Sequence, residues 1–342
     1  MLDFLYDFGL FFLKSLTVGS LIVIVIGGLM ALSIRTRRAH KEEISVEKLN
    51  DRYFDLKDSI MEEVLDESDF KHYLKEQKKE EEKKEKEKKK KSDGGQEEVK
   101  KRLYVLDFKG DVYAEDVDLL SEEVTAVLCV ARPYDEVLLR LESPGGVVHG
   151  YGLAASQLHR FKKRNIKLTV SVDKVAASGG YLMACVADKI IAAPFAVLGS
   201  VGVVAQLLNF NRVLKKYDVD VELHTAGQFK RTLTQLGENT DEARQKFKEE
   251  LEDVHILFKD YVHEHRKIVD IEKIATGEHW FGSRALELRL VDEILTSDEY
   301  LTLLSESTDI FLVKIERKKT LAQRLMGDLQ GFMQKSLSVR NY

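Results

Sequence analysis

The sequence predicts an α/β domain whose strands form a mainly parallel sheet. Strand-like apolar segments alternate with helix-like segments through the middle of the chain, a pattern typical of βαβ crossovers. Glycine-rich loops follow several of these strands, as loops do at the ligand-binding edge of a parallel sheet. The chain has 342 residues, of which 44% are hydrophobic, so it can bury a sizeable core.

An uncharged N-terminal segment predicts a transmembrane anchor within residues 1–35. Ser15–Ile34 holds twenty residues without a charge, which as a helix would span about 30 Å, the thickness of a bilayer core. A cleaved signal peptide is the alternative, because Ala31 begins a small-x-small cleavage pattern. The length of the run and the acidic Asp3 and Asp7 argue against it, since signal peptides begin with positive charge. We therefore expect a single-pass membrane protein.

The charges that flank the anchor predict its orientation. Lys14 precedes the anchor, whereas Arg35, Arg37, Arg38 and Lys41 follow it. By the positive-inside rule, the rest of the chain would lie on the cytoplasmic side of the membrane.

Residues 36–100 are expected to form a charged arm that is helical or disordered. Apolar residues at spacings of four and three predict an amphipathic helix or a short coiled coil: Leu49, Tyr53, Leu56, Ile60 and Val64. This stripe could pack on a sister chain or on the chain's own domain. Lys75–Lys91 then holds ten Lys and six Glu in seventeen residues, which predicts a solvated helix or a disordered tether.

The folded domain is expected over residues 101–315, because Ser92–Gly95 breaks the helical arm. Strands are predicted at Leu103–Phe108, Glu136–Glu142, Lys167–Asp173, Lys189–Ala193 and Val219–Thr225. Helices are predicted at Ala114–Ala131, Val147–Arg164, Tyr181–Val186, near Phe210–Tyr217 and, as a long helix, from Asn239. Residues 316–342 are expected to form an amphipathic tail with an apolar stripe of Leu321, Leu325, Leu329, Phe332 and Met333.

One apolar run within this domain allows a second interpretation. Ile190–Asn211 is twenty-two residues without a charge and could be a second membrane-spanning helix. Pro194, Gly199 and Gly202 favour buried strands instead, because these residues interrupt a helix.

The composition excludes several classes of function. The net charge of −5 argues against a nucleic-acid binder, which normally carries a basic domain or stripe. The chain has only two cysteines, Cys129 and Cys185, so neither a disulfide framework nor a cysteine-rich zinc site is expected.

Four glycine-containing loops follow predicted strands and are expected on one edge of the sheet: Ser143–Gly146, Ala177–Gly180, Gly199–Gly202 and Ala226–Lys230. Glycines there let backbone N–H groups face a ligand. Ser178 is the candidate nucleophile, because it would stand at a helix N-terminus, where partial positive charge favours a developing anion. The alternative is that Ser178 caps this helix, which is a common role for serine.

A serine nucleophile needs a base to take its proton. The nine histidines show no pattern that pairs one of them with Ser178. Lys230 ends one of the four loops, and a lysine acts as a base only when a dry cleft keeps its amine neutral. The alternative is an ordinary solvated loop lysine.

Four motifs resemble the signal peptide peptidase A family of Ser/Lys proteases: ESPGGVVHG at Glu142–Gly150, DKVAASGGY at Asp173–Tyr181, GSVGV at Gly199–Val203 and HTAGQFKRT at His224–Thr232. With the anchor, the charged arm and a single protease unit, the chain resembles the inner-membrane members of this family in Gram-negative bacteria. The resemblance implies a crotonase-like (ClpP-related) β-β-α spiral for the protease domain. Arg289 departs from the family, which usually has a glycine at this turn.

The resemblance also implies a mechanism. Ser178 would be the nucleophile, Lys230 the general base and Ser200 the hydroxyl that orients the lysine amine. The backbone N–H groups of Gly145 and Gly179 would form the oxyanion hole. Neutral Lys230 would take the proton as Ser178 attacks a peptide carbonyl, and would then activate the water that hydrolyses the acyl-enzyme. No metal, nucleotide or other cofactor would be required.

The resemblance also implies the substrates, the assembly and the location of the protein. The implied substrates are membrane-proximal or signal-peptide-like peptides, and the implied assembly is a homo-oligomer whose adjacent subunits share each active site. The family places its protease domain on the outer face of the inner membrane, against the charge count above. Two other functions would use the same features: a crotonase-type acyl-CoA enzyme, which needs no Ser178–Lys230 pair, and a non-enzymatic membrane scaffold, which needs no working dyad.

Overall fold

The computed structural model describes residues 9–17, 19–21, 42–93, 100–227 and 229–317. These residues belong to two units, 1–44 with 315–342 and 45–314, and most of the described residues lie in the second. No helix within the described ranges is both long enough and apolar enough to cross a membrane. The predicted anchor at Ser15–Ile34 lies mainly outside these ranges, as does the predicted tail beyond Arg317.

Seven strands form the larger sheet, in which every neighbouring pair from β10 to β9 is parallel. Their order is β1 (Glu42–Lys48), β10 (Asp309–Arg317), β2 (Arg102–Lys109), β3 (Glu136–Glu142), β4 (Lys167–Val172), β6 (Lys189–Ala192) and β9 (Glu293–Ile294). The register pairs Leu103 with Glu136 and Glu136 with Lys167, so these three strands begin almost level. The predicted α/β class is confirmed.

A second, smaller sheet has three short strands: β5 (Val175–Ala177), β7 (Val197–Gly199) and β8 (His279–Phe281). β5 and β7 are parallel, whereas β7 and β8 are antiparallel. No strand was predicted at β5, and its last residue, Ala177, was placed in a loop, because three residues are too few to show a strand period.

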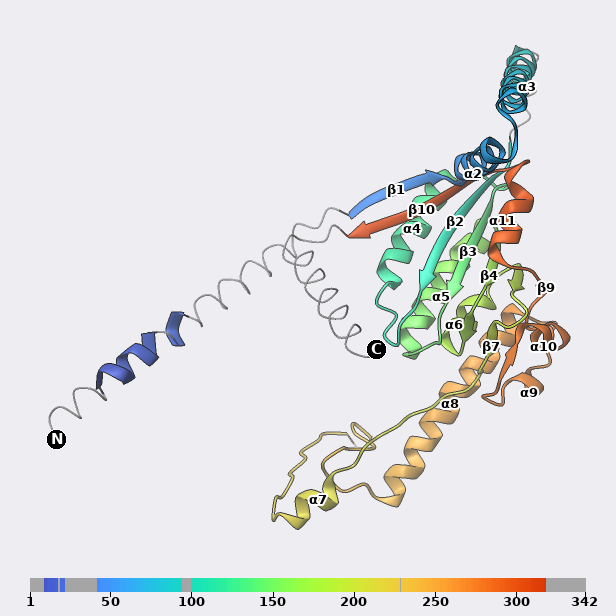
Figure 1. Cartoon of the computed structure of the whole chain (residues 1–342). Coiled ribbons are helices and arrows are strands. Elements are labelled where there is room, and N and C mark those ends of the chain that lie inside the picture. Colours follow the sequence, from blue (N-terminus) through green and yellow to red (C-terminus); the bar gives the residue numbers. More distant parts are fainter. Residues whose placement is uncertain (1–8, 18, 22–41, 94–99, 228, 318–342) are drawn as a thin grey trace. The chain divides into compact units, whose positions relative to one another are not determined.

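Helices cover both faces of the larger sheet (Figure 1). Side chains alternate between the two faces along β2. Tyr104 and Leu106 join the core formed with α4 (Val117–Val130), α5 (Val148–Lys163) and α6 (Gly179–Ala184). Leu103 and Val105 join a second core with α11 (Ser297–Ser305) and the start of α2 (Leu49–Val64).

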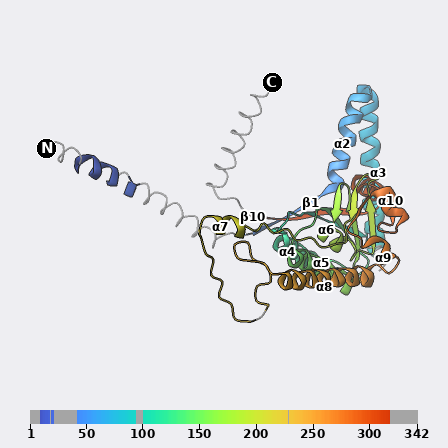
Figure 2. The same ribbon diagram turned by 90° about the horizontal axis from the view of Figure 1, so that it is seen from below.

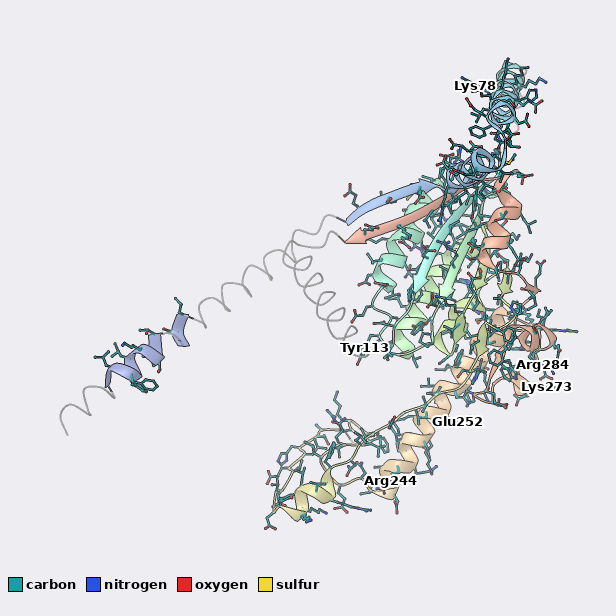
Figure 3. All side chains as sticks on the ribbon, in the orientation of Figure 1. Lys78, Tyr113, Arg244, Glu252, Lys273 and Arg284 are labelled. Carbon is teal, nitrogen blue, oxygen red and sulfur yellow. The ribbon has the colours of Figure 1, made fainter. Side chains whose placement is uncertain are left out.

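The predicted arm, residues 36–100, is not helical throughout its described part: Glu42–Lys48 form the strand β1 of the larger sheet, and the helices follow it. α2 and α3 (Glu67–Asp93) lie side by side, and Lys78 on α3 is exposed (Figures 2 and 3). Asn50, in the first turn of α2, is buried and hydrogen-bonds Ser305 O, Thr308 O and the N–H of Ile310. The first turn of the predicted apolar stripe therefore packs on the chain's own domain. Farther along α2, the stripe is exposed at Leu56, Ile60 and Val64.

The segment that follows β7 departs from the prediction. Val219–Thr225 was expected to be a strand, but it is irregular and pairs with no described strand, so that prediction is wrong. Its alternating apolar residues find no sheet to cover them, and Leu223 is exposed. The helix before it, α7 (Asn211–Lys216), lies within the predicted Phe210–Tyr217 and has no buried residue.

Ile190–Asn211 is not one spanning helix. It contributes to β6, forms β7, and continues as irregular chain from Ser200 until α7 begins at its last residue, Asn211. The turn that follows β6 contains Pro194, and β7 ends at Gly199, whose φ of +97° lies in the left-handed region. The interpretation as buried strands is confirmed for the two strand segments.

The C-terminal third begins with the predicted long helix, α8 (Asp241–His265), which is capped by the Thr240 side chain. The helices α9 (Ile271–Ile274) and α10 (Gly282–Glu287) follow it. α10 ends at Glu287, and Arg289, two residues later, has a φ of +61°. Leu290 N–H bonds to Ala285 O at 2.8 Å and Arg289 N–H to Leu286 O at 3.0 Å, as in a Schellman motif. Arginine thus makes the left-handed turn for which glycine is usual.

Candidate active site

Ser178 stands at a sharp turn between a strand and a helix. β5 ends at Ala177 and α6 begins at Gly179, and Ser178 between them has φ 51° and ψ −118°. Such angles are unfavourable for any residue with a Cβ, so the surroundings must hold them. The Ser178 N–H donates to Gly199 O at 2.8 Å, which ties the turn to the end of β7.

The Ser178 side chain does not cap α6. Its hydroxyl makes no capping hydrogen bond, although the residue occupies the N-cap position. Within the described chain no other hydrogen bond to Ser178 Oγ is found. The hydroxyl is therefore available to a ligand, and the interpretation of Ser178 as a helix cap is wrong.

The loop after β3 passes directly against this turn. Gly145 has a φ of +86°, and a Cβ there would lie 2.6 Å from Ala177 O and 2.8 Å from both Gly179 N and Ser178 Cβ. Only glycine allows this approach. The loop is also fixed from the other side, because the Val147 N–H donates to Val112 O at 2.8 Å.

The backbone N–H groups beside Ser178 differ in what they bind. The Gly145 N–H donates to Ser143 Oγ at 3.1 Å. The N–H groups of Gly146 and Gly179 have no acceptor within the described residues. An unpaired N–H next to a serine hydroxyl is what an oxyanion hole requires. The oxyanion-hole roles of Gly145 and Gly179 remain predictions.

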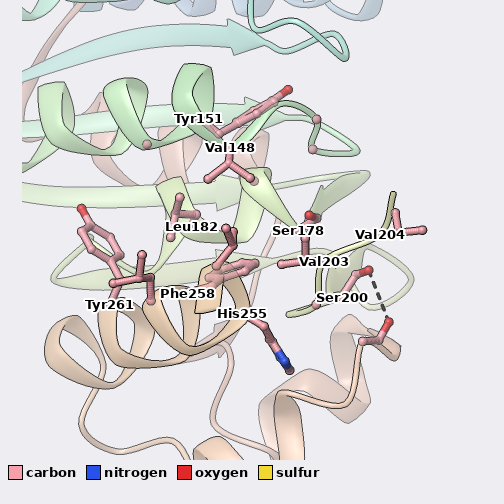
Figure 4. A pocket seen from close by; sticks show the side chains of 18 of the residues that line it. Val148, Tyr151, Ser178, Leu182, Ser200, Val203, Val204, His255, Phe258 and Tyr261 are labelled. Atoms are coloured by element: carbon pink, nitrogen blue, oxygen red, sulfur yellow. Dashed lines mark hydrogen bonds between the residues drawn. The ribbon is translucent and has the colours of Figure 1, made fainter. Parts of the chain in front are cut away.

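Ser200 lies beside Ser178 because β5 and β7 are paired. It follows Gly199, the last residue of β7, with a φ of +52°, and its N–H donates to Glu278 O at 2.6 Å. Its hydroxyl makes a long hydrogen bond of 3.4 Å to Gly277 O (Figure 4). The hydroxyl is thus only weakly engaged in this chain.

A pocket of about 800 Å³ opens over these residues (Figure 4). The predicted site residues Gly145, Ser178, Gly179 and Ser200 all line it. Most of the remaining wall is apolar and comes from α5, α6, α8 and the chain after β7, including Val148, Leu182, Val203, Leu257, Phe258 and Tyr261. The pocket can therefore surround apolar side chains of a ligand that reaches Ser178.

The sequence analysis missed the contribution of α8. His255 lines the pocket, and its Nε2 is buried without a hydrogen-bond partner in the described structure. His255 and Phe258 lie almost eighty residues after Ser178, on the long helix predicted from Asn239, to which the sequence assigned no site residue. Their spacing matches an ordinary amphipathic helix, so no sequence signal separated pocket residues from core residues.

Lys230 is the predicted site residue that the structure does not bring to the pocket. It is exposed, and the residues that line the pocket do not include it. It belongs to the irregular chain between α7 and α8, and its N–H donates to Gly227 O at 3.2 Å. The neighbouring Phe229 ring contacts α8, where Lys246 Nζ lies 5.1 Å from the ring centre. Within one chain, Ser178 and Lys230 are therefore separate.

Comparison with known proteins decides the family. Residues 3–158 match the model of the N-terminal part of peptidase family S49, and residues 160–310 match the model of peptidase family S49. A relative named "Probable protease SohB" from Haemophilus influenzae is 51% identical, over 94% of this chain and 92% of that protein. The chain belongs to peptidase family S49. The predicted resemblance to a Ser/Lys protease family is thereby confirmed at the level of S49 and its SohB members.

A further relative and a solved structure are also similar to this chain. A second "Probable protease SohB", from Buchnera aphidicola subsp. Schlechtendalia chinensis, is 48% identical over 88% of this chain and 99% of that protein. Among solved structures, the membrane-bound stomatin-specific protease 1510-N with a substrate peptide matches with a TM-score of 0.41 and 13% identity, over 68% of this chain and 98% of that one.

The two S49 family regions meet inside a single domain. Their boundary, at residues 158–160, falls within α5. The first region supplies β2, β3 and the Gly145 loop, whereas the second supplies β4 and the Ser178 turn. Because β3 and β4 are neighbours, the candidate site draws residues from both regions.

Proposed function

We propose that this S49 chain is a membrane-anchored serine endopeptidase with a Ser/Lys dyad, in which Ser178 is the nucleophile and Lys230 the general base. The Ser178 turn carries the proposal. Its hydroxyl lines an apolar pocket without capping α6, and the neighbouring Gly179 N–H has no acceptor in the described chain. A free hydroxyl and a free amide side by side are the groups that attack on a carbonyl requires.

The reaction follows from these groups. Neutral Lys230 takes the proton of Ser178 Oγ as the oxygen bonds to the peptide carbonyl carbon. The carbonyl oxygen becomes an anion, which accepts hydrogen bonds from the N–H groups of Gly179 and Gly146. The other predicted donor, the Gly145 N–H, is already bonded to Ser143 Oγ, so Gly146 takes its place in the proposal. The lysine ammonium then protonates the leaving amine as the C–N bond breaks. A water molecule, deprotonated by the same lysine, then bonds to the acyl carbon. The bond from that carbon to Ser178 Oγ breaks as the lysine ammonium returns its proton to Oγ.

Ser200 is proposed to orient the lysine amine. It lines the same pocket as Ser178, and its 3.4 Å bond to Gly277 O is long enough to be exchanged for a better partner. A hydroxyl that accepts from the lysine N–H would direct the amine's lone pair toward Ser178 Oγ.

A second copy of the chain is proposed to deliver Lys230. An exposed lysine surrounded by water stays charged, so the base requires a wall that one chain does not provide. The stretch from Val204 to Leu236, which includes α7 and Lys230, exposes many large apolar side chains, as an unoccupied interface does: Val204, Leu208, Phe210, Val213, Tyr217, Leu223, Phe229 and Leu236. We infer a homo-oligomer in which the serine and the lysine of each site come from adjacent chains.

The proposal also includes the fold of the protease domain, the kind of substrate and the location of the protein. The paired large and small sheets support a crotonase-like β-β-α spiral. The apolar pocket supports peptides with apolar side chains, such as membrane-proximal or signal-peptide-like segments. The uncharged run Ser15–Ile34 supports a single-pass anchor in a bacterial inner membrane.

Replacement of the nucleophile tests the proposal. Ser178→Ala should abolish peptide cleavage and labelling by a fluorophosphonate probe, because both reactions need the hydroxyl. The thermal unfolding midpoint should change little, since the substitution removes one oxygen with no hydrogen bond in the described chain. Cleavage by purified Ser178→Ala protein at a rate near wild type would refute the assignment.

A further inference from the structure

A buried network of hydroxyl groups lies directly behind the glycine segments of the site. The Tyr151 hydroxyl donates to Asp111 O at 2.6 Å, and Ser143 Oγ lies 2.5 Å from Tyr151 Oη. The Gly145 N–H donates to Ser143 Oγ at 3.1 Å. Tyr151 and Ser143 have no solvent exposure, so bulk water does not compete for these hydrogen bonds.

The direction of each hydrogen bond in this network is fixed. A carbonyl oxygen only accepts, so Asp111 O takes the single hydrogen of the Tyr151 phenol. Ser143 must then donate its own hydrogen to Tyr151 Oη, which leaves a lone pair on Ser143 Oγ for the Gly145 N–H. Burial raises the pKa of Tyr151, against a smaller lowering effect of the Ser143 hydrogen bond, and so keeps the phenol protonated.

The ring of Tyr151 packs against the residue that follows the nucleophile. A Cβ on Gly179 would lie 2.6 Å from Tyr151 Cδ2, so the ring rests on the Gly179 backbone. Tyr151 is therefore linked to both glycine segments beside Ser178, the Gly145 loop and Gly179. It contacts Gly179 through its ring, and it reaches Gly145 through its hydroxyl and Ser143.

We propose that Tyr151 is a positioning residue that, through Ser143, holds the Gly145–Gly146 loop at a fixed distance from Gly179 and so sets the geometry of the oxyanion hole. The inference rests on the proposed function, since it assigns the network to the reaction at Ser178. Oxyanion donors act at hydrogen-bond distance from a charge that develops only in the transition state. A loosened loop therefore lowers turnover more than it weakens substrate binding.

Removal of the Tyr151 hydroxyl tests this role. Tyr151→Phe keeps the ring against Gly179 but leaves Ser143 without the acceptor that orients it. We expect kcat to fall about 10- to 100-fold while KM changes less than about threefold. A fluorophosphonate probe should label Tyr151→Phe protein to the same final stoichiometry as wild type, at a rate reduced in parallel with kcat.

A double-mutant cycle distinguishes a chain of hydrogen bonds from two independent effects. Ser143→Ala removes the acceptor of the Gly145 N–H and should lower kcat to a similar extent. Because both residues act on the same peptide, the double variant Tyr151→Phe/Ser143→Ala should be little worse than the poorer single variant. Multiplied losses of kcat in the double variant would overturn the proposal.

Tyr181→Phe is the matched control. Tyr181 is also fully buried and donates to a backbone carbonyl, Leu290 O, at 3.0 Å. Its variant should lose stability as Tyr151→Phe does, yet retain wild-type kcat. Equal kcat in the two variants would make Tyr151 merely structural and overturn the inference. If Ser178→Ala protein stays active or is still labelled, the proposed function itself fails, a separate result.

Discussion

The strained backbone of Ser178 is part of how the site presents a hydroxyl. With φ 51° and ψ −118°, the residue points its side chain away from the helix that it precedes, so Oγ stays free of the α6 amides. Ser200 has a similar positive φ of 52° at the end of β7. Left-handed angles at non-glycine residues cost about 1–3 kcal/mol each and persist only where the fold enforces them. Here the hydrogen bond from Ser178 N–H to Gly199 O enforces one of them.

This strain predicts a difference between two inactive variants. Ser178→Ala keeps a Cβ and hence the strain, whereas Ser178→Gly relieves it at some cost in unfolded-state entropy. We expect Ser178→Gly to be more stable than Ser178→Ala by about 1 kcal/mol in the free energy of unfolding. Urea denaturation of the two proteins measures the difference. Equal stabilities, or a less stable glycine variant, would mean that the turn is not strained.

The helices α5 and α8 are joined by a hydrogen bond between two histidines, His159 and His265. His265, at the end of α8, has its Nδ1 2.9 Å from Tyr261 O, which requires that nitrogen to donate. Its Nε2 is then the acceptor for His159 Nδ1 of α5, at 3.2 Å. Burial, with His265 and Lys163 nearby, lowers the pKa of His159 below 6.5. Protonation of His159 is therefore disfavoured where α5 and α8 meet.

The histidine pair predicts loss of stability on mild acidification. Because the pKa of His159 is lower in the folded state, the unfolded chain binds more protons once the pH falls below about 6.5, and the free energy of unfolding decreases. The contribution is present above that pH. Urea midpoints at about pH 7.5 and about pH 5.5 measure it. Glutamine does not titrate, so His159→Gln should reduce the difference between the two urea midpoints. If that difference is unchanged in the variant, other residues cause the loss of stability.

Prediction and structure agree best for long elements and for elements rich in apolar residues. The strand Glu136–Glu142 has the predicted bounds, and α5 differs by one residue at each end. Ser178, Gly145, Gly179 and Ser200 line one pocket, but Ser178 and Ser200 follow strands of the smaller sheet, whereas the prediction had placed all four glycine-containing loops on one edge of a single parallel sheet. The irregular chain at Val219–Thr225 was mistaken for a strand, because its alternating apolar residues carry the strand pattern without a neighbour to pair with.

Across the molecule, the proposed site residues fall into two groups: those that buried contacts within one chain hold in place, and Lys230, which is exposed. The Ser178 turn, the Gly145 loop and Tyr151 are held by buried contacts within one chain. Lys230 lies within the stretch from Val204 to Leu236, whose large apolar side chains are mostly exposed, as at Val204 with 92%. A single chain that leaves so much apolar surface uncovered beside an incomplete site is suited to assembly with its own copies.

Mixed assembly of two inactive variants tests whether each site is shared. Ser178→Ala and Lys230→Ala proteins should each be inactive alone, one without a nucleophile and one without a base. When the two are co-assembled in equal amounts, about a quarter of the interfaces should combine an intact serine with an intact lysine and recover activity in that proportion. Native mass or cross-linking must show that mixed oligomers form. If they form and remain as inactive as either parent, Ser178 and Lys230 act within one chain, and the segment that carries Lys230 must fold back over its own pocket.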